Sequence, residues 1–330
     1  MKEIMNRIKN FHWNAVYLKE SKLRVRNVKF ALTVLFYNLI LIGIAIFGFS
    51  VAFSTTMTGR VEYSNAIALY AALIAIEAGM VMFLVPAFTA GSIAGEREKQ
   101  TLEILLTTTL KPGQIVWGKL MSSISMVLLL IVSTLPTISI IFTIGGVDIF
   151  DLLEFVVVIF VCTLLIGSIG IWASVMMKRT VPATVFAYGG IILLCAITVI
   201  IVGVVWVVRS LYYAQMLAQG RVVTIDVSPV LLVLLFNPVC TLVEALMKQF
   251  AGESIMMNVM THSGNILPNV VREYWVIFSL VAQAALACFI MRMAGKQLDP
   301  LRKKKVNHKK KRVKNSKIDE TQKGVSPKSY

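Results

Sequence analysis

Charged residues are scarce in this chain. Asp, Glu, Lys and Arg make up 15% of the 330 residues, whereas 57% are hydrophobic. Water-soluble globular proteins of this length carry about a quarter of charged residues, so the composition excludes an ordinary soluble domain. The chain is therefore expected to lie in a bilayer.

Cysteine and histidine are also rare. The four cysteines are isolated and show no C-x-x-C spacing, so neither a disulfide framework nor a zinc site is predicted. The three histidines form no H-E-x-x-H motif, which argues against a membrane metalloprotease. We expect no metal site and no catalytic residue in this chain.

Five long runs without charge, and a sixth interrupted only by Glu77, set the number of membrane spans. Six segments reach the roughly 18 apolar residues that a spanning helix needs. They cover about residues 30–54, 66–90, 120–144, 155–177, 183–208 and 273–292. The expected fold class is an all-α polytopic membrane protein whose six-helix transmembrane domain occupies residues 30–294.

Lysine and arginine are distributed unevenly along the chain. Residues 1–29 hold eight of them, the loop 91–119 four, the turn 178–179 two and the segment from Arg292 onward fourteen, which makes 28 of 33. Cytoplasmic segments carry an excess of these residues, so both termini are predicted to be cytoplasmic. We also expect the membrane to be the plasma membrane. No cleavable signal peptide fits, and the first span is expected to be a retained anchor.

The two ends of the chain differ in character. Residues 1–29 carry apolar side chains at helical spacing, such as Ile4, Ile8 and Phe11, which predicts an amphipathic helix along the inner leaflet. A plain basic anchor without further role is the alternative. Residues 295–330 are basic and expected to be disordered, with lipid headgroups rather than nucleic acid as partners.

One segment tests the number of spans. Residues 227–246 are nearly long enough to cross, but contain Pro229, Asn237, Pro238 and Glu244. A crossing here would also place the basic C-terminal segment outside. We therefore expect a re-entrant or surface-lying hairpin within an outer cap formed by residues 209–272.

The segment between the second and third spans, residues 95–120, is the most informative part of the chain. Its charges, Glu96 to Lys99 and Glu103, exclude it from hydrocarbon, while Leu102, Leu105 and Leu106 form an apolar stripe. Pro112 is suited to begin the next helix. The pattern predicts a short amphipathic helix over residues 96–106, able to pass a push from a soluble partner to the membrane.

A phosphate-loop pattern occurs in the same segment. Gly113 to Lys119 match G-x-x-x-x-G-K, but Leu120 replaces the Ser or Thr that would bind Mg²⁺. No buried strand precedes it, so ATP binding by this chain is not expected. Lys119 is expected to reach toward the inner membrane interface beside Trp117.

This loop resembles that of the type-2 (ABC-2) permeases of ATP-binding-cassette exporters, E-R-E-x-G-T-L-E-x-L-L. The chain has E-R-E-K-Q-T-L-E-I-L-L at residues 96–106, followed by Leu110, Ile115, Gly118 and Lys119. A weaker similarity is N-A-V-Y-L-K-E at residues 14–20, beside the N-P-V-x-x-K-E of such permeases. Gln100 replaces the usual Gly and Thr109 a frequent Pro.

The resemblance implies a homo- or heterodimer of permease subunits, each docked through this loop on a separate ATPase that binds ATP and Mg²⁺. Transport would be outward, and this chain would hold no cofactor and perform no catalysis. The residues implied in coupling to the ATPase are Glu96, Arg97, Glu98, Thr101, Leu102, Glu103, Leu105 and Leu106. Leu102 and Glu103 are the expected contacts, and Glu96 and Arg97 the expected helix start.

Glu77 is the one ionisable residue deep within a span. An acidic side chain there costs about 2.5–3.5 kcal/mol on insertion scales, so it must face protein or water. It is either a contact in the substrate pathway or a protonated or hydrogen-bonded packing residue paired with a Ser or Thr of a neighbouring span. A channel, a scaffold or a membrane enzyme without an ATPase partner is the alternative function for the whole chain.

Overall fold

The structure is a computed structural model that describes residues 17, 20, 27–54, 63–107, 111–145, 149–219, 228–251, 254–255 and 269–298. Within these ranges the chain forms helices and no strand. Six helices are long and apolar enough to cross a membrane. They are α3 (Val28–Ser54), α4 (Tyr63–Glu98), α6 (Pro112–Gly145), α7 (Ile149–Met176), α8 (Thr180–Ala218) and α13 (Trp275–Leu298). The predicted all-α polytopic membrane fold with six spans is confirmed.

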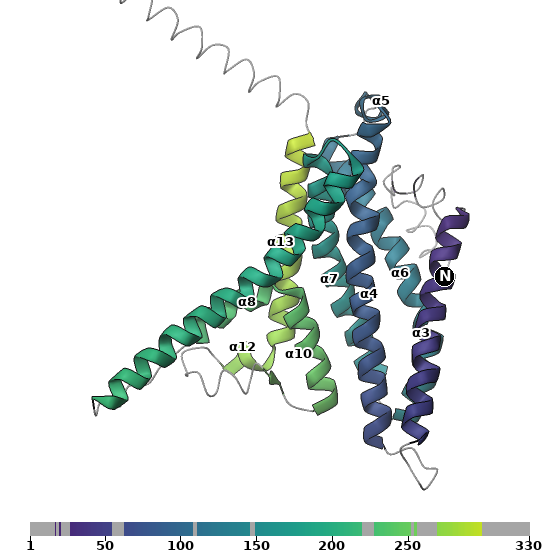
Figure 1. Ribbon diagram of the computed structural model, residues 1–330. Helices are drawn as coiled ribbons and strands as arrows, with labels where there is room; N and C mark the ends of the chain where they lie inside the picture. The colour runs from purple at the N-terminus through teal and green to yellow at the C-terminus, as the bar shows by residue number, and fades with distance from the viewer. Residues whose placement is uncertain are drawn as a thin grey trace, which may run out of the picture.

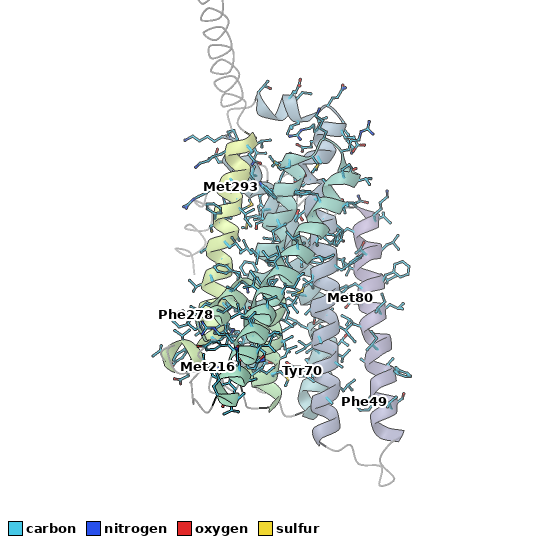
Figure 2. The ribbon with its side chains drawn as sticks, turned by 60° about the vertical axis from the view of Figure 1, so that its left-hand side comes forward. Phe49, Tyr70, Met80, Met216, Phe278 and Met293 are labelled. Atoms are coloured by element: carbon cyan, nitrogen blue, oxygen red, sulfur yellow. The ribbon has the colours of Figure 1, made fainter. Side chains whose placement is uncertain are left out.

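The helices alternate in direction through the bundle (Figure 1). Tyr70 and Met80 mark α4, and Phe278 and Met293 mark α13; both helices run toward the end that carries the short helix α5 (Leu102–Leu106) (Figure 2). Phe49 and Met216 show that α3 and α8 end on the opposite side. The start of α6 and the end of α4 therefore meet at the end marked by α5.

Packing is uneven among the spans. In their most apolar windows, 67% of α6 and 56% of α7 are buried, but only 11% of α3 and 6% of α8. Helices α4, α6, α7 and α13 form the core of the bundle, and α3 lies at its edge (Figure 1). Helix α8 starts beside the core and leans away from it along its length (Figure 1).

The helices extend beyond the predicted apolar runs. Helix α4 continues from the predicted end at residue 90 to Glu98, and α6 begins at Pro112 rather than near residue 120. Proline suits the first turn of a helix, because its missing N–H would have no partner there. Helix α8 continues to Ala218, ten residues past the predicted end at 208. Apolarity marks the part of a helix that suits a membrane, but it does not mark the helix end.

The segment before α13 is broken. It comprises α9 (Ser228–Leu231), the 3-10 helix η1 (Leu232–Phe236), α10 (Pro238–Ala251) and α12 (Asn269–Glu273). The axes on either side of Asn237 differ by 101°. The Asn237 side chain accepts hydrogen bonds from the N–H groups of Val239 and Cys240, and donates to Thr198 Oγ1 on α8 at 2.8 Å. The expected break in this segment is present, while its place relative to a membrane stays a prediction.

The predicted amphipathic helix of residues 1–29 lies largely outside the described residues, as does the basic segment after residue 298. Within the first 26 positions, Tyr17 and Glu20 are described, and both are helical. Both contact α6, where the Tyr17 hydroxyl oxygen lies 3.1 Å from Ser125 Oγ. The described part of the N-terminal segment thus faces protein at this point.

Candidate coupling site

Helix α4 ends in a left-handed turn at Gln100. Gln100 has a φ of 60°, and it is the only non-glycine residue with a positive φ among those described. Its N–H donates to the carbonyl of Arg97 at 3.1 Å, and the N–H of Thr101 donates to the carbonyl of Glu96 at 2.9 Å. These two bonds form a Schellman motif, in which glycine usually occupies the left-handed position. The family pattern has glycine at this position.

This turn corrects the predicted coupling helix. Residues 96–106 do not form one helix, because Glu96 to Glu98 are the last turn of α4 and only Leu102–Leu106 form α5. Glu96 and Arg97 therefore lie at a helix end, not at a helix start. The physical reason is that each of the three charged residues binds a different neighbouring helix and so extends α4.

Glu96 binds the start of α6 through Lys119. The Lys119 Nζ atom lies 2.7 Å from Glu96 Oε1, 2.6 Å from Glu20 Oε1 and 2.9 Å from the carbonyl oxygen of Ser92. An ammonium group has three N–H donors, so all three are used. Lys119 is buried, and the expectation that it reaches toward the membrane interface is wrong.

Arg97 binds the end of α7. Its Nη1 donates to the carbonyl oxygens of Met177 at 2.6 Å and Val175 at 3.1 Å. The last carbonyls of a helix have no partner within the helix, and a cation there also interacts favourably with the helix dipole. Arg97 thus caps a helix that begins on a distant part of the chain.

Glu98 binds the start of α8. Its Oε2 accepts hydrogen bonds from the N–H and the hydroxyl of Thr180 at 3.1 and 2.9 Å. The residue before α8, Arg179, makes no capping hydrogen bond with its own side chain. A carboxylate is favoured at a helix N-terminus, where N–H groups are free to donate. The end of α4 therefore supplies the cap that α8 lacks in its own sequence.

Glu96, Arg97 and Glu98 together form a joint between the end of α4 and helices α6, α7 and α8. Helices α4 and α7 approach closely next to this joint. The Ser174 Oγ atom accepts from the N–H groups of Ile93 and Ala94 at 2.9 and 2.8 Å. One turn earlier on α7, a Cβ built on Gly170 would lie 2.0 Å from Thr89 Oγ1. Only glycine fits at that position, and the contact holds the last turns of α4 against α7.

Of the two apolar side chains described on helix α5, one is buried and one is exposed. Leu102 is 6% exposed and belongs to a buried cluster with Ile93, Ile115 and Leu298. Ile104 is 69% exposed, and its neighbour Glu103 is exposed as well. Thr101, also exposed, bonds back to the Glu96 carbonyl, and the side chains of Leu105 and Leu106 lie outside the described part. Leu102 thus anchors α5, and Glu103 and Ile104 face outward.

Glu77 lies far from this joint, in the membrane-spanning part of α4. It is fully buried, and its Oε1 atom lies 2.5 Å from Thr134 Oγ1 on α6. A threonine of a neighbouring span is the kind of partner that the packing interpretation requires. This side chain has no exposed surface in the described structure.

Sequence reasoning did not find the roles of four residues of this region. Lys119 and Glu20 lie in the motifs that resemble the ABC-2 permeases, but the sequence does not show that they meet. Ile104 lies outside the apolar stripe, so the sequence gives no reason to single it out. Ser174 carries no signal in the sequence at all, since a serine in an apolar helix is common.

Comparison with known proteins gives one family. No curated protein matches the chain. The family model described as ABC-2 family transporter protein matches residues 14–264, which is more than half of the chain and includes Glu20, the joint at the end of α4 and α5. The family is a membrane transport component that in general works with an ABC ATPase subunit. The chain belongs to the ABC-2 family of transporter proteins and is a multi-pass permease component of an ABC transporter.

Proposed function

We propose that this chain is the permease subunit of an ATP-driven exporter and that the end of α4 transmits the movement of a separate ATPase to the membrane spans. The observation that carries the proposal is the joint at Glu96, Arg97 and Glu98. These three consecutive side chains bind α6, the end of α7 and the start of α8, respectively. A displacement of α5 would therefore be passed to four spans at once.

In the proposed complex, two permease subunits each dock on one ATPase, which binds ATP and Mg²⁺. Glu103 and Ile104 contact the ATPase, and Leu102 positions α5 from beneath. Closure of the ATPases presses on α5, and the spans tilt so that a central path opens outward. Both termini and α5 lie in the cytoplasm, and the membrane is the plasma membrane.

Glu77 enters this proposal as a residue of the substrate pathway. It is sealed between helices in the conformation described, so a pathway that reaches it requires α4 and α6 to separate. The contact between Glu77 and Thr134 is the one that such a separation would break.

The test is copurification of the tagged full chain from its native cells in mild detergent, with mass spectrometry of soluble partners. An ABC ATPase is expected with the wild type and should be lost from an Ile104→Asp/Glu103→Arg variant. Lys178→Glu is the matched control, because it also changes an exposed charge but lies in the turn between α7 and α8. Absence of an ATPase from the wild-type dimer would overturn the proposal in favour of a channel or scaffold.

A further inference from the structure

The carboxyl group of Glu77 makes a single described hydrogen bond, and it is with a hydroxyl group. Glu77 Oε1 lies 2.5 Å from Thr134 Oγ1. The other oxygen, Oε2, is buried without a hydrogen-bond partner. Both ion pairs in the described part of the chain are made by Lys119, so none of the cations described there neutralises Glu77.

The number of hydrogen atoms decides which group donates. Thr134 Oγ1 lies 2.7 Å from the carbonyl oxygen of Ile131 and 2.5 Å from Glu77 Oε1. A hydroxyl group has one hydrogen to donate, and a carbonyl oxygen can only accept. If the Thr134 hydrogen is donated to Ile131, the contact with Glu77 requires a hydrogen on the carboxyl group. If it is donated to Glu77, two oxygen atoms with lone pairs face each other at 2.7 Å.

The surroundings favour the first arrangement. An ionised carboxylate accepts at both oxygens, and burial without compensation strongly disfavours its charge. The described ionisable groups that interact electrostatically with Glu77 include the phenols of Tyr37 on α3 and of Tyr70 on its own helix, α4. Neither supplies positive charge, and Asp151 on α7, which interacts with Tyr70, is itself acidic.

We propose that Glu77 is a proton-binding site, and that the bound proton forms the hydrogen bond from the carboxyl group on α4 to Thr134 on α6. The proton makes the side chain neutral, so α4 crosses the apolar layer without a buried charge. The assignment stands apart from the transport mechanism. One consequence rests on the proposed function: if α4 separates from α6 during transport, the carboxyl group becomes exposed to water and releases the proton.

Infrared spectroscopy of the full chain in lipid nanodiscs at pH 7 tests the proposal. The wild-type minus Glu77→Gln difference spectrum should contain the C=O stretch of a protonated carboxylic acid. The control is Glu98→Gln, which removes an exposed acid and should change only carboxylate bands. Loss of carboxylate bands alone in Glu77→Gln would overturn the proposal. An ATPase that fails to copurify would leave this spectrum unaffected, so the two proposals fail separately.

A second variant keeps the test decisive if Glu77→Gln does not fold. Thr134→Val removes the hydroxyl group, and Thr134→Ser retains it. We expect Thr134→Val, but not Thr134→Ser, to shift the carboxylic acid band, whereas a shift confined to carboxylate bands contradicts the proposal. Spectra are recorded in sodium chloride and in choline chloride. An acid band that is present only without sodium would show a cation site instead, and would also overturn the assignment.

Discussion

The ammonium nitrogen of Lys119 lies 2.6 Å from a carboxylate oxygen of Glu20, which is 99 positions earlier in the chain. The same nitrogen lies 2.7 Å from Glu96. One buried cation thus joins the N-terminal segment, the end of α4 and the start of α6. Lys119 contacts both carboxylates, so the joint depends on the cation more than on either acid.

Replacement of Lys119 by methionine should therefore be costly. Removing one partner of a buried ion pair typically destabilises by about 3–5 kcal/mol, since the remaining charge stays buried. Glu20 and Glu96 retain some exposure, so we expect a loss near the lower end, about 3 kcal/mol. Thermal unfolding in detergent measures it. Lys111→Met, at an exposed position, should change stability by less than about 0.5 kcal/mol, and equal melting temperatures for the two variants would contradict the role of Lys119.

The left-handed turn at Gln100 predicts a stabilising substitution. A residue with a side chain destabilises the folded state by about 1–2 kcal/mol in this conformation, and glycine does not. Gln100→Gly should therefore raise the free energy of unfolding by about 1 kcal/mol. Lys99→Gly is the control, because Lys99 has a negative φ and glycine there only adds backbone freedom to the unfolded chain. A lower melting temperature for Gln100→Gly than for the wild type would show that the turn is not left-handed.

The sequence predicts the number of spans, but neither the ends of the helices nor the contacts at the joint. Six spans follow from five charge-free runs and a sixth that only Glu77 interrupts, because a bilayer imposes a minimum length on each helix. The boundaries do not follow, since α4 and α6 continue through polar residues that find partners in neighbouring helices. Glu96, Arg97 and Glu98 look like an exposed charged face in the sequence. Their partners lie 23, 80 and 82 positions away, and one sequence does not show such pairings.

The sequence shows that Gln100 departs from the family pattern, but it does not show what this departure means for the backbone. The family pattern has glycine there, and the structure shows why: the position requires a positive φ. Leu102 illustrates the opposite case. Its place on the apolar stripe predicts a contact with the ATPase, but Leu102 packs against the chain's own helices, and a stripe alone does not tell these two cases apart.

Leu102 and Ile104 should therefore respond differently to the same substitution. Leu102→Asp places a carboxylate in the cluster that holds α5, and we expect a loss of more than about 3 kcal/mol. Ile104→Asp changes a side chain that is 69% exposed, so stability should change by less than about 0.5 kcal/mol. Melting temperatures of the isolated permease separate the two. Comparable destabilisation would mean that Ile104 also packs within the chain.

The contact between α4 and α7 predicts a large difference between two glycines. Gly170→Ala brings Cβ to 2.0 Å from Thr89 Oγ1, and overpacking of this kind costs about 1–3 kcal/mol or more. Gly189→Ala on α8 meets no atom within 4 Å, and should gain up to about 1 kcal/mol from the higher helix propensity of alanine. Unfolding in detergent measures both. If Gly170→Ala were as stable as the wild type, α4 and α7 would not be this close.

The lean of α8 relates the position of this helix to the thickness of the bilayer. The uncharged stretch from Val181 to Val208 extends about 42 Å along a helix axis, whereas the hydrocarbon core is about 30 Å thick. An upright α8 would expose about 12 Å of apolar surface to water, and tilting removes that mismatch. Thinner lipids require a greater tilt, and the start of α8 is bonded to the end of α4 through Thr180 and Glu98. The acyl-chain length of the surrounding lipids is thereby linked, through α8, to the position of the end of α4, which α5 follows.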